Sequence, residues 1–183
     1  MKKHIAVVID WFGPYKLNEK LRIATRDYYS GGLYVSIGKT KFKKQSNLQY
    51  IGISDSLHDR VNVSHPKLNL IERDNSIWLG EIVSFSVPGK RIFVKESQLE
   101  IAEWALIYFL KPRLNVKKRA KPPSHPCTVL NRWWHSNYNT PRMTSPHPDW
   151  ADIINYYGMD EEAQVIYLKR VTGRIKRIKP EDI

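Results

Sequence analysis

The stretch EWALIYFLKPRLN, from Glu103 to Asn115, places a carboxylate within a run of residues that is otherwise suited to burial. On a helix, positions three, four or seven apart share one side, so Glu103 projects from an apolar face formed by Leu99, Leu106, Ile107 and Leu110. An ionised carboxylate in such a place costs several kcal/mol unless it has a partner. A metal ion, an arginine or a capping interaction would each serve, and the helix alone does not choose among them.

The segments before this stretch predict a small sheet. We expect a helix from about Gln98 to Lys111, because Pro112 cannot continue one. Residues 32–38 and 48–54 are short β-rich runs joined by a loop of lysines, which predicts a hairpin, and residues 76–86 predict a third strand. Ser56 can cap a short helix that carries Arg60. The predicted core is therefore a sheet with helices beside it.

Further segments flank this core on both sides. Residues 5–9 predict a buried strand, and the apolar spacing from Leu17 to Tyr28 predicts a helix ended by Gly31 and Gly32. Prolines recur from Ala120 to about Pro148, which predicts an arm on the surface. Residues 164–179 alternate apolar and basic side chains about Thr172 and Gly173, which predicts a hairpin with one basic face.

These patterns predict an α+β fold, in which helices flank a small antiparallel β-sheet. We divide the chain into an N-terminal strand and helix packed on the core (1–31), a central module (32–119), and a C-terminal arm with a basic β-hairpin (120–183).

The charge of the chain favours a polyanionic partner. Lysine and arginine number 30 against 18 acids, which gives a net charge of +12 and a pI near 9.8 over 183 residues. The positive residues are bunched, so we expect nucleic acid rather than an anionic membrane. The candidate phosphate-binding residues are Lys39, Lys41, Lys43, Lys44, Arg174, Lys176 and Arg177.

Cysteine usage and hydropathy predict a cytoplasmic protein with no membrane span. Cys127 is the only cysteine, so no intrachain disulfide can form. The apolar run at the N-terminus stops at Asp10 and is too short for an export signal. The longest apolar run elsewhere, residues 104–110, cannot cross a bilayer.

Three short motifs resemble the GIY-YIG nuclease family. They are GLY at residues 32–34, YIGISDSLHDR at residues 50–60, and the stretch from Glu103 to Asn115. Their order and internal spacing match the family, and together they cover residues 32–115. Leu33 stands in place of the usual isoleucine, and the segment between the two tyrosine motifs is long and rich in lysine. His65 lies one residue later than the histidine that many members carry.

The resemblance implies an endonuclease that hydrolyses phosphodiester bonds in DNA with one divalent metal ion, Mg²⁺ or Mn²⁺. It implies that Tyr34 orients or deprotonates the attacking water, with Tyr50 beside it. It further implies that Arg60 stabilises the phosphate in the transition state and that Glu103 binds the metal. The remaining expected contributors are Gly52, which allows close backbone approach, Asn115, which fixes the turn after the helix, and His65.

Several alternatives stay open. Glu103 could pair with Arg60 or Lys111 for structural reasons alone. The chain could act on RNA, or could bind nucleic acid without cutting it. The spacing of His125, Cys127, His135 and His147 matches no familiar zinc module, and the aromatic residues Trp133, Trp134 and Tyr138 could either stack on bases or pack the arm down. The oligomeric state is not predicted.

Overall fold

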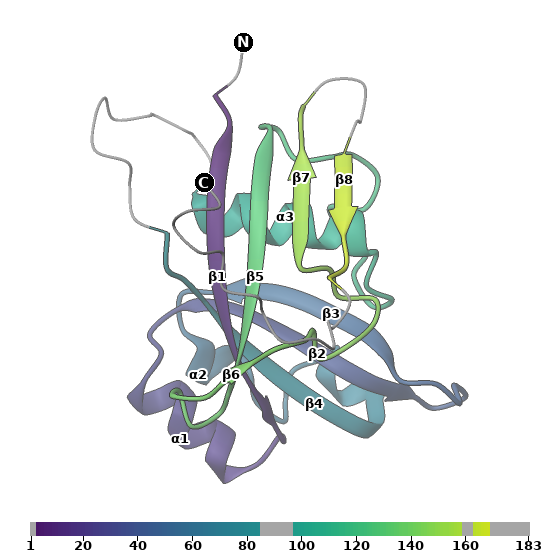
Figure 1. The fold of residues 1–183 in the computed structure, drawn as a ribbon. Coiled ribbons are helices and arrows are strands. Elements are labelled where there is room, and N and C mark those ends of the chain that lie inside the picture. Colours follow the sequence, from purple (N-terminus) through teal and green to yellow (C-terminus); the bar gives the residue numbers. More distant parts are fainter. Residues whose placement is uncertain (1–2, 85–96, 159–162, 169–183) are drawn as a thin grey trace, which may run out of the picture.

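A computed structural model describes residues 3–84, 97–158 and 163–168 of the chain. The strands belong to one curled, eight-stranded sheet (Figure 1). The elements are β1 (Ile5–Tyr15), α1 (Glu19–Asp27), β2 (Gly32–Thr40), β3 (Asn47–Ser54), α2 (Leu57–Arg60), the 3₁₀ helix η1 (Leu68–Leu70), β4 (Ile71–Ile82), α3 (Gln98–Leu110), β5 (Cys127–His135), β6 (Pro141–Arg142), β7 (Ile153–Tyr156) and β8 (Ala163–Ile166).

The strands follow the order β3-β2-β4-β1-β5-β7-β8, and β6 pairs with β5. The pair β1 and β5 is parallel, and the other neighbours are antiparallel. The α+β prediction is thus confirmed, but the sheet is larger than the small antiparallel one we expected, because segments from both ends of the chain join it.

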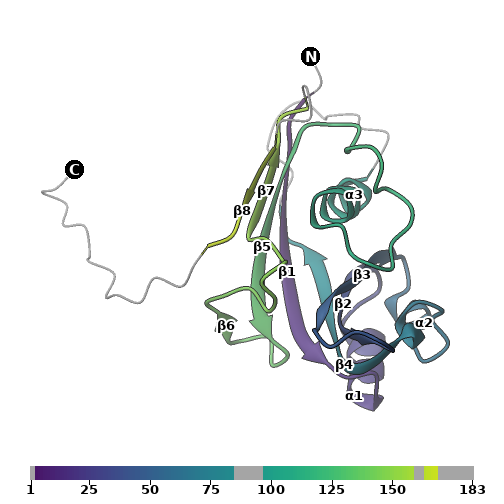
Figure 2. The ribbon, with the colours of Figure 1, turned by 90° about the vertical axis from the view of Figure 1, so that its right-hand side faces the viewer.

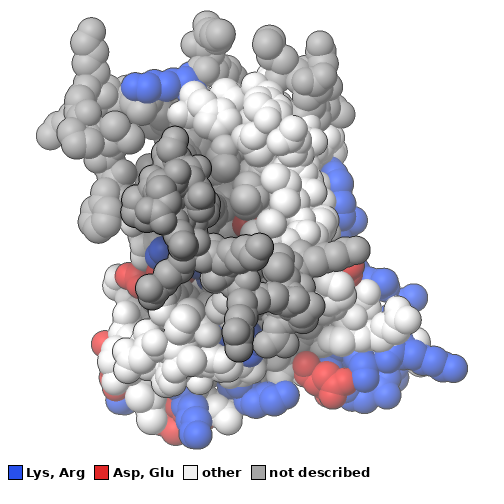
Figure 3. All heavy atoms as spheres, viewed as in Figure 1, with Lys and Arg blue, Asp and Glu red and all other residues white. Residues whose placement is uncertain are grey.

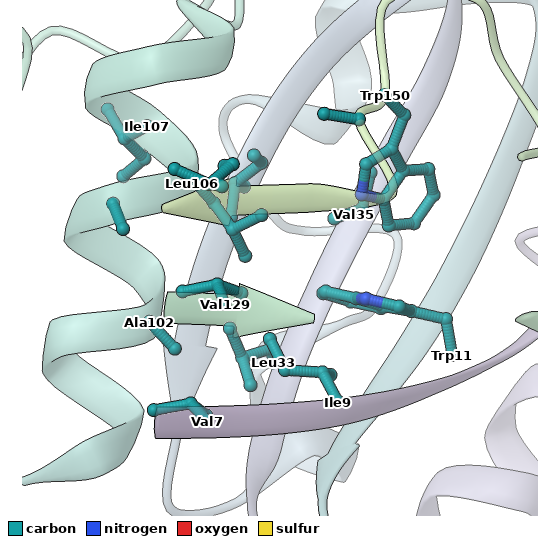
Figure 4. Close-up of a cluster of buried hydrophobic side chains, with 14 of the residues drawn as sticks. Val7, Ile9, Trp11, Leu33, Val35, Ala102, Leu106, Ile107, Val129 and Trp150 are labelled. Carbon is teal, nitrogen blue, oxygen red and sulfur yellow. The ribbon is translucent and has the colours of Figure 1, made fainter. Parts of the chain in front are cut away.

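The two faces of the sheet carry separate hydrophobic clusters. Side chains alternate along β2, so Leu33 and Val35 face α3, while Tyr34 faces the cluster that includes residues of α1 and α2. Figure 2 shows α3 lying on the inner side of the curled sheet. In Figure 4, Ala102 and Leu106 of α3 meet side chains from several strands. The sheet therefore separates the surroundings of Tyr34 from those of α3.

The predicted helix near Glu103 is confirmed, and local signals set both of its ends. Ser97 and Glu100 form a reciprocal capping box at its N-terminus. At the other end Lys111 adopts a left-handed conformation with φ of 50°, directly before Pro112. The hairpin of residues 32–54 is also confirmed, since β2 and β3 pair in antiparallel register.

The predicted surface arm between Ala120 and Pro148 is wrong, because this segment supplies a long strand of the sheet. β5 pairs along its length with β1, and Trp133 and Trp150 lie in the buried core. Alternate residues of β5 are buried, which is the period of a half-buried strand. The N-terminal strand β1 lies inside the sheet, between β4 and β5.

β1 also continues past Ile9, where we predicted its end, because the charge of the next residue, Asp10, is compensated by Arg132. Asp10 and Arg132 are opposite each other in the parallel register of β1 and β5. The guanidinium donates from Nε to Oδ1 at 2.6 Å and from Nη2 to Oδ2 at 2.7 Å. A bidentate pair of this kind allows a carboxylate to sit in a buried strand.

The predicted C-terminal hairpin about Thr172 and Gly173 lies outside the described residues, as do Arg174, Lys176 and Arg177. The start of that segment, in β8, pairs with the preceding strand β7. Within the described part of the chain, no helix is both long and apolar enough to cross a membrane.

Candidate active site

Tyr34 is fully buried in β2, and its ring lies directly over a glycine of the neighbouring strand. Gly52 is its partner in the β2–β3 register. A Cβ atom at position 52 would come within 2.6 Å of the Tyr34 hydroxyl and 2.7 Å of its Cζ, distances that real Cβ contacts do not reach. The close approach that we predicted at Gly52 is therefore made by the ring of Tyr34 rather than by another backbone segment. Glycine is needed here for space.

Two side chains donate hydrogen bonds to the Tyr34 hydroxyl. Nε of Arg60 lies 3.2 Å from it, and Nε2 of His65 lies 2.9 Å from it. The other ring nitrogen of His65, Nδ1, accepts from the backbone N–H groups of Lys67 and Leu68 at 3.1 and 3.2 Å. Because Nδ1 accepts, the proton of the neutral imidazole is on Nε2, and His65 donates to Tyr34.

Burial sets the charge states in this group. It lowers the pKa of His65 to about 4, with the nearby Arg60 charge adding to the effect, so the imidazole is neutral at pH 7. Burial likewise raises the pKa of Tyr34 above its ordinary range, and Tyr50 adds to this, while the hydrogen bond from Arg60 opposes it. The hydrogen bond to Tyr34 raises the pKa of Arg60. At neutral pH the group holds a phenol, a neutral imidazole and a guanidinium.

Tyr50 completes the group from β3. Its ring centroid is 5.9 Å from that of Tyr34 and 5.3 Å from that of His65, and the side chain is half-buried. Tyr50 and Gly52 lie two residues apart on one strand, so they share the sheet face that Tyr34 occupies. The structure therefore brings together Tyr34, Tyr50, Gly52, Arg60 and His65.

We had predicted that Asn115 fixes the turn after α3. Its side chain instead bonds to the outer edge of β3. Its side-chain oxygen accepts from the Ile51 N–H at 2.9 Å, and its side-chain amide donates to the Ile51 carbonyl at 2.8 Å. The backbone N–H of Leu114 also donates to Gln49 at 2.8 Å. These bonds satisfy backbone groups of a sheet edge and fix β3, which carries Tyr50 and Gly52.

Glu103 is not in contact with this group. Its Oε2 accepts from Nζ of Lys118 at 2.5 Å, and its side chain is only 12% exposed. The structural partners we considered, Arg60 and Lys111, are not the ones it uses. Lys118 follows Asn115 by three residues, on a segment that folds back beside α3, and no spacing rule would identify it as the partner of Glu103.

The donor atoms at Glu103 limit the metals that could bind there. The described residues contain no group of three or more His, Cys, Asp or Glu side chains that could hold a metal ion. A centre built from several protein ligands, such as zinc, is thus not formed by the described part of the chain. Mg²⁺ often takes one carboxylate and fills its other positions with water and phosphate oxygens. The Glu103 carboxylate is already paired with Lys118, so a single-carboxylate Mg²⁺ site there would have to compete with that ammonium.

The predicted phosphate-binding lysines differ in their surroundings. Lys39 pairs with Asp74, whereas Lys41, Lys43 and Lys44 are exposed in the β2–β3 loop. Figure 3 shows Lys and Arg side chains gathered where this hairpin projects, with acidic side chains next to them.

The aromatic residues near β5 pack inward. Trp133 is 5% exposed and meets Trp150 at a centroid distance of 6.1 Å, while Trp134 and Tyr138 lie against Phe12. These contacts favour packing over base stacking. Cys127 is buried in the core, which raises the pKa of its thiol to about 12.

Comparison of the chain with protein-family models, curated proteins and solved structures gave no match.

Proposed function

We propose that this chain is an endonuclease that hydrolyses phosphodiester bonds in DNA, with Tyr34, Tyr50, Arg60 and His65 at its centre. The observation that carries the proposal is the buried Tyr34 hydroxyl, held by Arg60 and His65 above a glycine that leaves no room for a side chain. Such preorganised donors at a buried hydroxyl are typical of catalytic groups.

The hydrogen-bond geometry supports one of the two roles considered for Tyr34. A phenol oxygen has two acceptor positions, and Arg60 and His65 occupy both. The hydroxyl keeps its own proton, because burial raises the pKa of Tyr34 and a hydrogen bond with Tyr50 adds to this effect. We infer that Tyr34 does not act as a base at neutral pH and that, being fully buried, it orients the reactants by fixing the exposed Arg60 beside it.

Arg60 is suited to hold the phosphate. Its Nε is fixed by Tyr34, while the side chain remains exposed at the end of α2. As the bond from water to phosphorus forms and the bond to the leaving sugar oxygen breaks, negative charge on the phosphoryl oxygens is stabilised by this guanidinium. Mg²⁺ or Mn²⁺ held by Glu103 stays part of the proposal; it would neutralise phosphate charge beside α3, whereas Arg60 acts on the face of the sheet that carries Tyr34. The net charge of +12 supports a polyanionic substrate.

Two other functions share part of this support. RNA offers the same phosphate chemistry, and a non-catalytic nucleic-acid-binding module would use the same lysines. The non-catalytic alternative leaves the arrangement at Tyr34 without a purpose, and we therefore favour the nuclease. We also propose a cytoplasmic location, because the single cysteine is a buried thiol.

The test is a cleavage assay with labelled duplex, branched and single-stranded DNA and with matched RNA. Each substrate is incubated with Mg²⁺, with Mn²⁺ and with a chelator. Cleavage of DNA that needs the metal and that falls in a Tyr34→Phe variant supports the proposal. Cleavage of RNA alone would favour the first alternative, and tight binding without cleavage of any substrate would favour the second.

A further inference from the structure

The tip of the β2–β3 hairpin carries an exposed aromatic ring among lysines. Phe42 is 87% exposed, although a phenylalanine side chain normally gains from burial. Lys41, Lys43 and Lys44 surround it in sequence and are exposed as well. The Lys41 ammonium lies 5.6 Å from the centroid of the Phe42 ring. An exposed aromatic ring with cations on both sides needs a partner that offers both an apolar face and negative charge.

The fold holds this tip in a defined shape. The backbone N–H of Lys43 donates to the Thr40 carbonyl at 3.0 Å, which closes a four-residue turn with Phe42 at its third position. Nη2 of Arg73, from β4, donates to the Lys43 carbonyl at 3.2 Å, and Lys39 pairs with Asp74. Strand pairing and these hydrogen bonds hold Phe42 at the tip of the hairpin, where its ring stays exposed.

We propose that this tip is a base-stacking element, in which Phe42 stacks on an unpaired nucleobase and Lys41, Lys43 and Lys44 bind the phosphates beside it. Nucleic acid is the polyanion that also provides flat apolar faces, and stacking on aromatic side chains tolerates any base. The inference rests on the proposed function, because strand β2 joins the tip to Tyr34 of the candidate active site, so both would contact one nucleic-acid substrate. At about 3.3 Å per residue, the six residues from Tyr34 to Thr40 span about 20 Å. The tip thus grips the substrate away from the bond that is cut, and a substrate with an unpaired segment is the class it would select.

Binding is measured in a Tyr34→Phe background with chelator present, so that cleavage does not affect the result. The probes are a single-stranded oligothymidylate of roughly 12 nucleotides and an abasic oligomer of the same length, which has the same phosphates but no bases. We expect the unaltered tip to bind the first about tenfold more tightly than the second. Phe42→Ala should lose this difference, and Phe42→Trp should keep it. Met143→Ala, which alters another side chain that is 78% exposed, is the control and should keep it too.

Three outcomes would overturn the inference. They are equal affinity of the unaltered tip for the two oligomers, a preference that survives in Phe42→Ala, and a full preference in Phe42→Leu, which is apolar but has no π-face. If the two oligomers bind equally and Phe42→Ala instead loses binding to phosphatidylserine vesicles, the tip is a membrane contact. Replacing the three lysines by glutamine should lower the salt dependence of binding to both oligomers. Because cleavage is assayed separately, the nuclease proposal can fail while this inference stands, and the reverse also holds.

Discussion

Gly52→Ala tests whether the position of the Tyr34 hydroxyl controls activity. To move from 2.6 Å to the 3.4 Å at which ordinary contacts begin, the hydroxyl must retreat from the new methyl group by about 0.8 Å. A shift of that size is enough to lengthen the 2.9 Å bond to His65 beyond about 3.2 Å, where such bonds weaken. Overpacking lowers the free energy of unfolding by about 1–3 kcal/mol. Replacing glycine by alanine also reduces the entropy of the unfolded chain, which raises that free energy by about 0.4–1 kcal/mol. The net fall should be about 1–2 kcal/mol. Single-turnover cleavage should fall by about 10²-fold, since misplacement by about 1 Å has that effect.

Gly38→Ala is the matched control for this experiment. Gly38 lies in β2, and a Cβ atom there would meet Ile71 Cγ2 at 2.5 Å and the backbone carbonyl oxygen of Arg73 at 2.9 Å, so it is at least as crowded but away from Tyr34. It should lower stability at least as much as Gly52→Ala in urea unfolding, while the folded protein cleaves at the parent rate. Adding Gly52→Ala to Tyr34→Phe should reduce cleavage little further, because both changes act on one hydroxyl. Full activity in Gly52→Ala, or equal losses in the two alanine variants, would refute the reasoning.

Three further predictions concern neighbouring groups. Tyr34→Phe should lower cleavage by about 10²-fold in single-turnover kinetics. It should also lower the free energy of unfolding in urea by about 1–3 kcal/mol, because the buried His65 N–H loses its acceptor. Unchanged stability would contradict the hydrogen bond between Tyr34 and His65. Glu103→Gln should abolish cleavage, and Lys118→Met should lower the Mg²⁺ concentration needed for half-maximal rate because it removes a competing cation; if Lys118→Met only destabilises the protein, the pair is structural. The depressed pKa of His65 means that the unfolded chain binds a proton first as pH falls, so stability should drop between pH 6.5 and about 4, by at most about 1.4 kcal/mol per unit; unfolding of His65→Gln across this range should lack that part of the slope.

Much of the candidate site follows from local sequence. Tyr34, Tyr50 and Gly52 lie on a hairpin that the β-rich runs predict, and the period of two places them on one face. Ser56 caps α2 as predicted, which positions Arg60. The role of His65 was not predictable, because its contact with Tyr34 crosses 31 positions of sequence. Lys118 was not predictable for a similar reason, since its ion pair with Glu103 depends on how the chain returns after Pro112.

The sequence by itself determined the elements whose signals lie within a few residues of one another. The capping box and Pro112 bound α3, and the β-rich runs of residues 32–54 give the hairpin. Only the tertiary structure decided that Cys127–His135 would pair in parallel with β1, across about 120 positions, and bury Trp133. The physical reason is range: caps and turns are fixed by neighbouring backbone groups, whereas the pairing of distant strands depends on which arrangement buries the most apolar surface across the whole sheet.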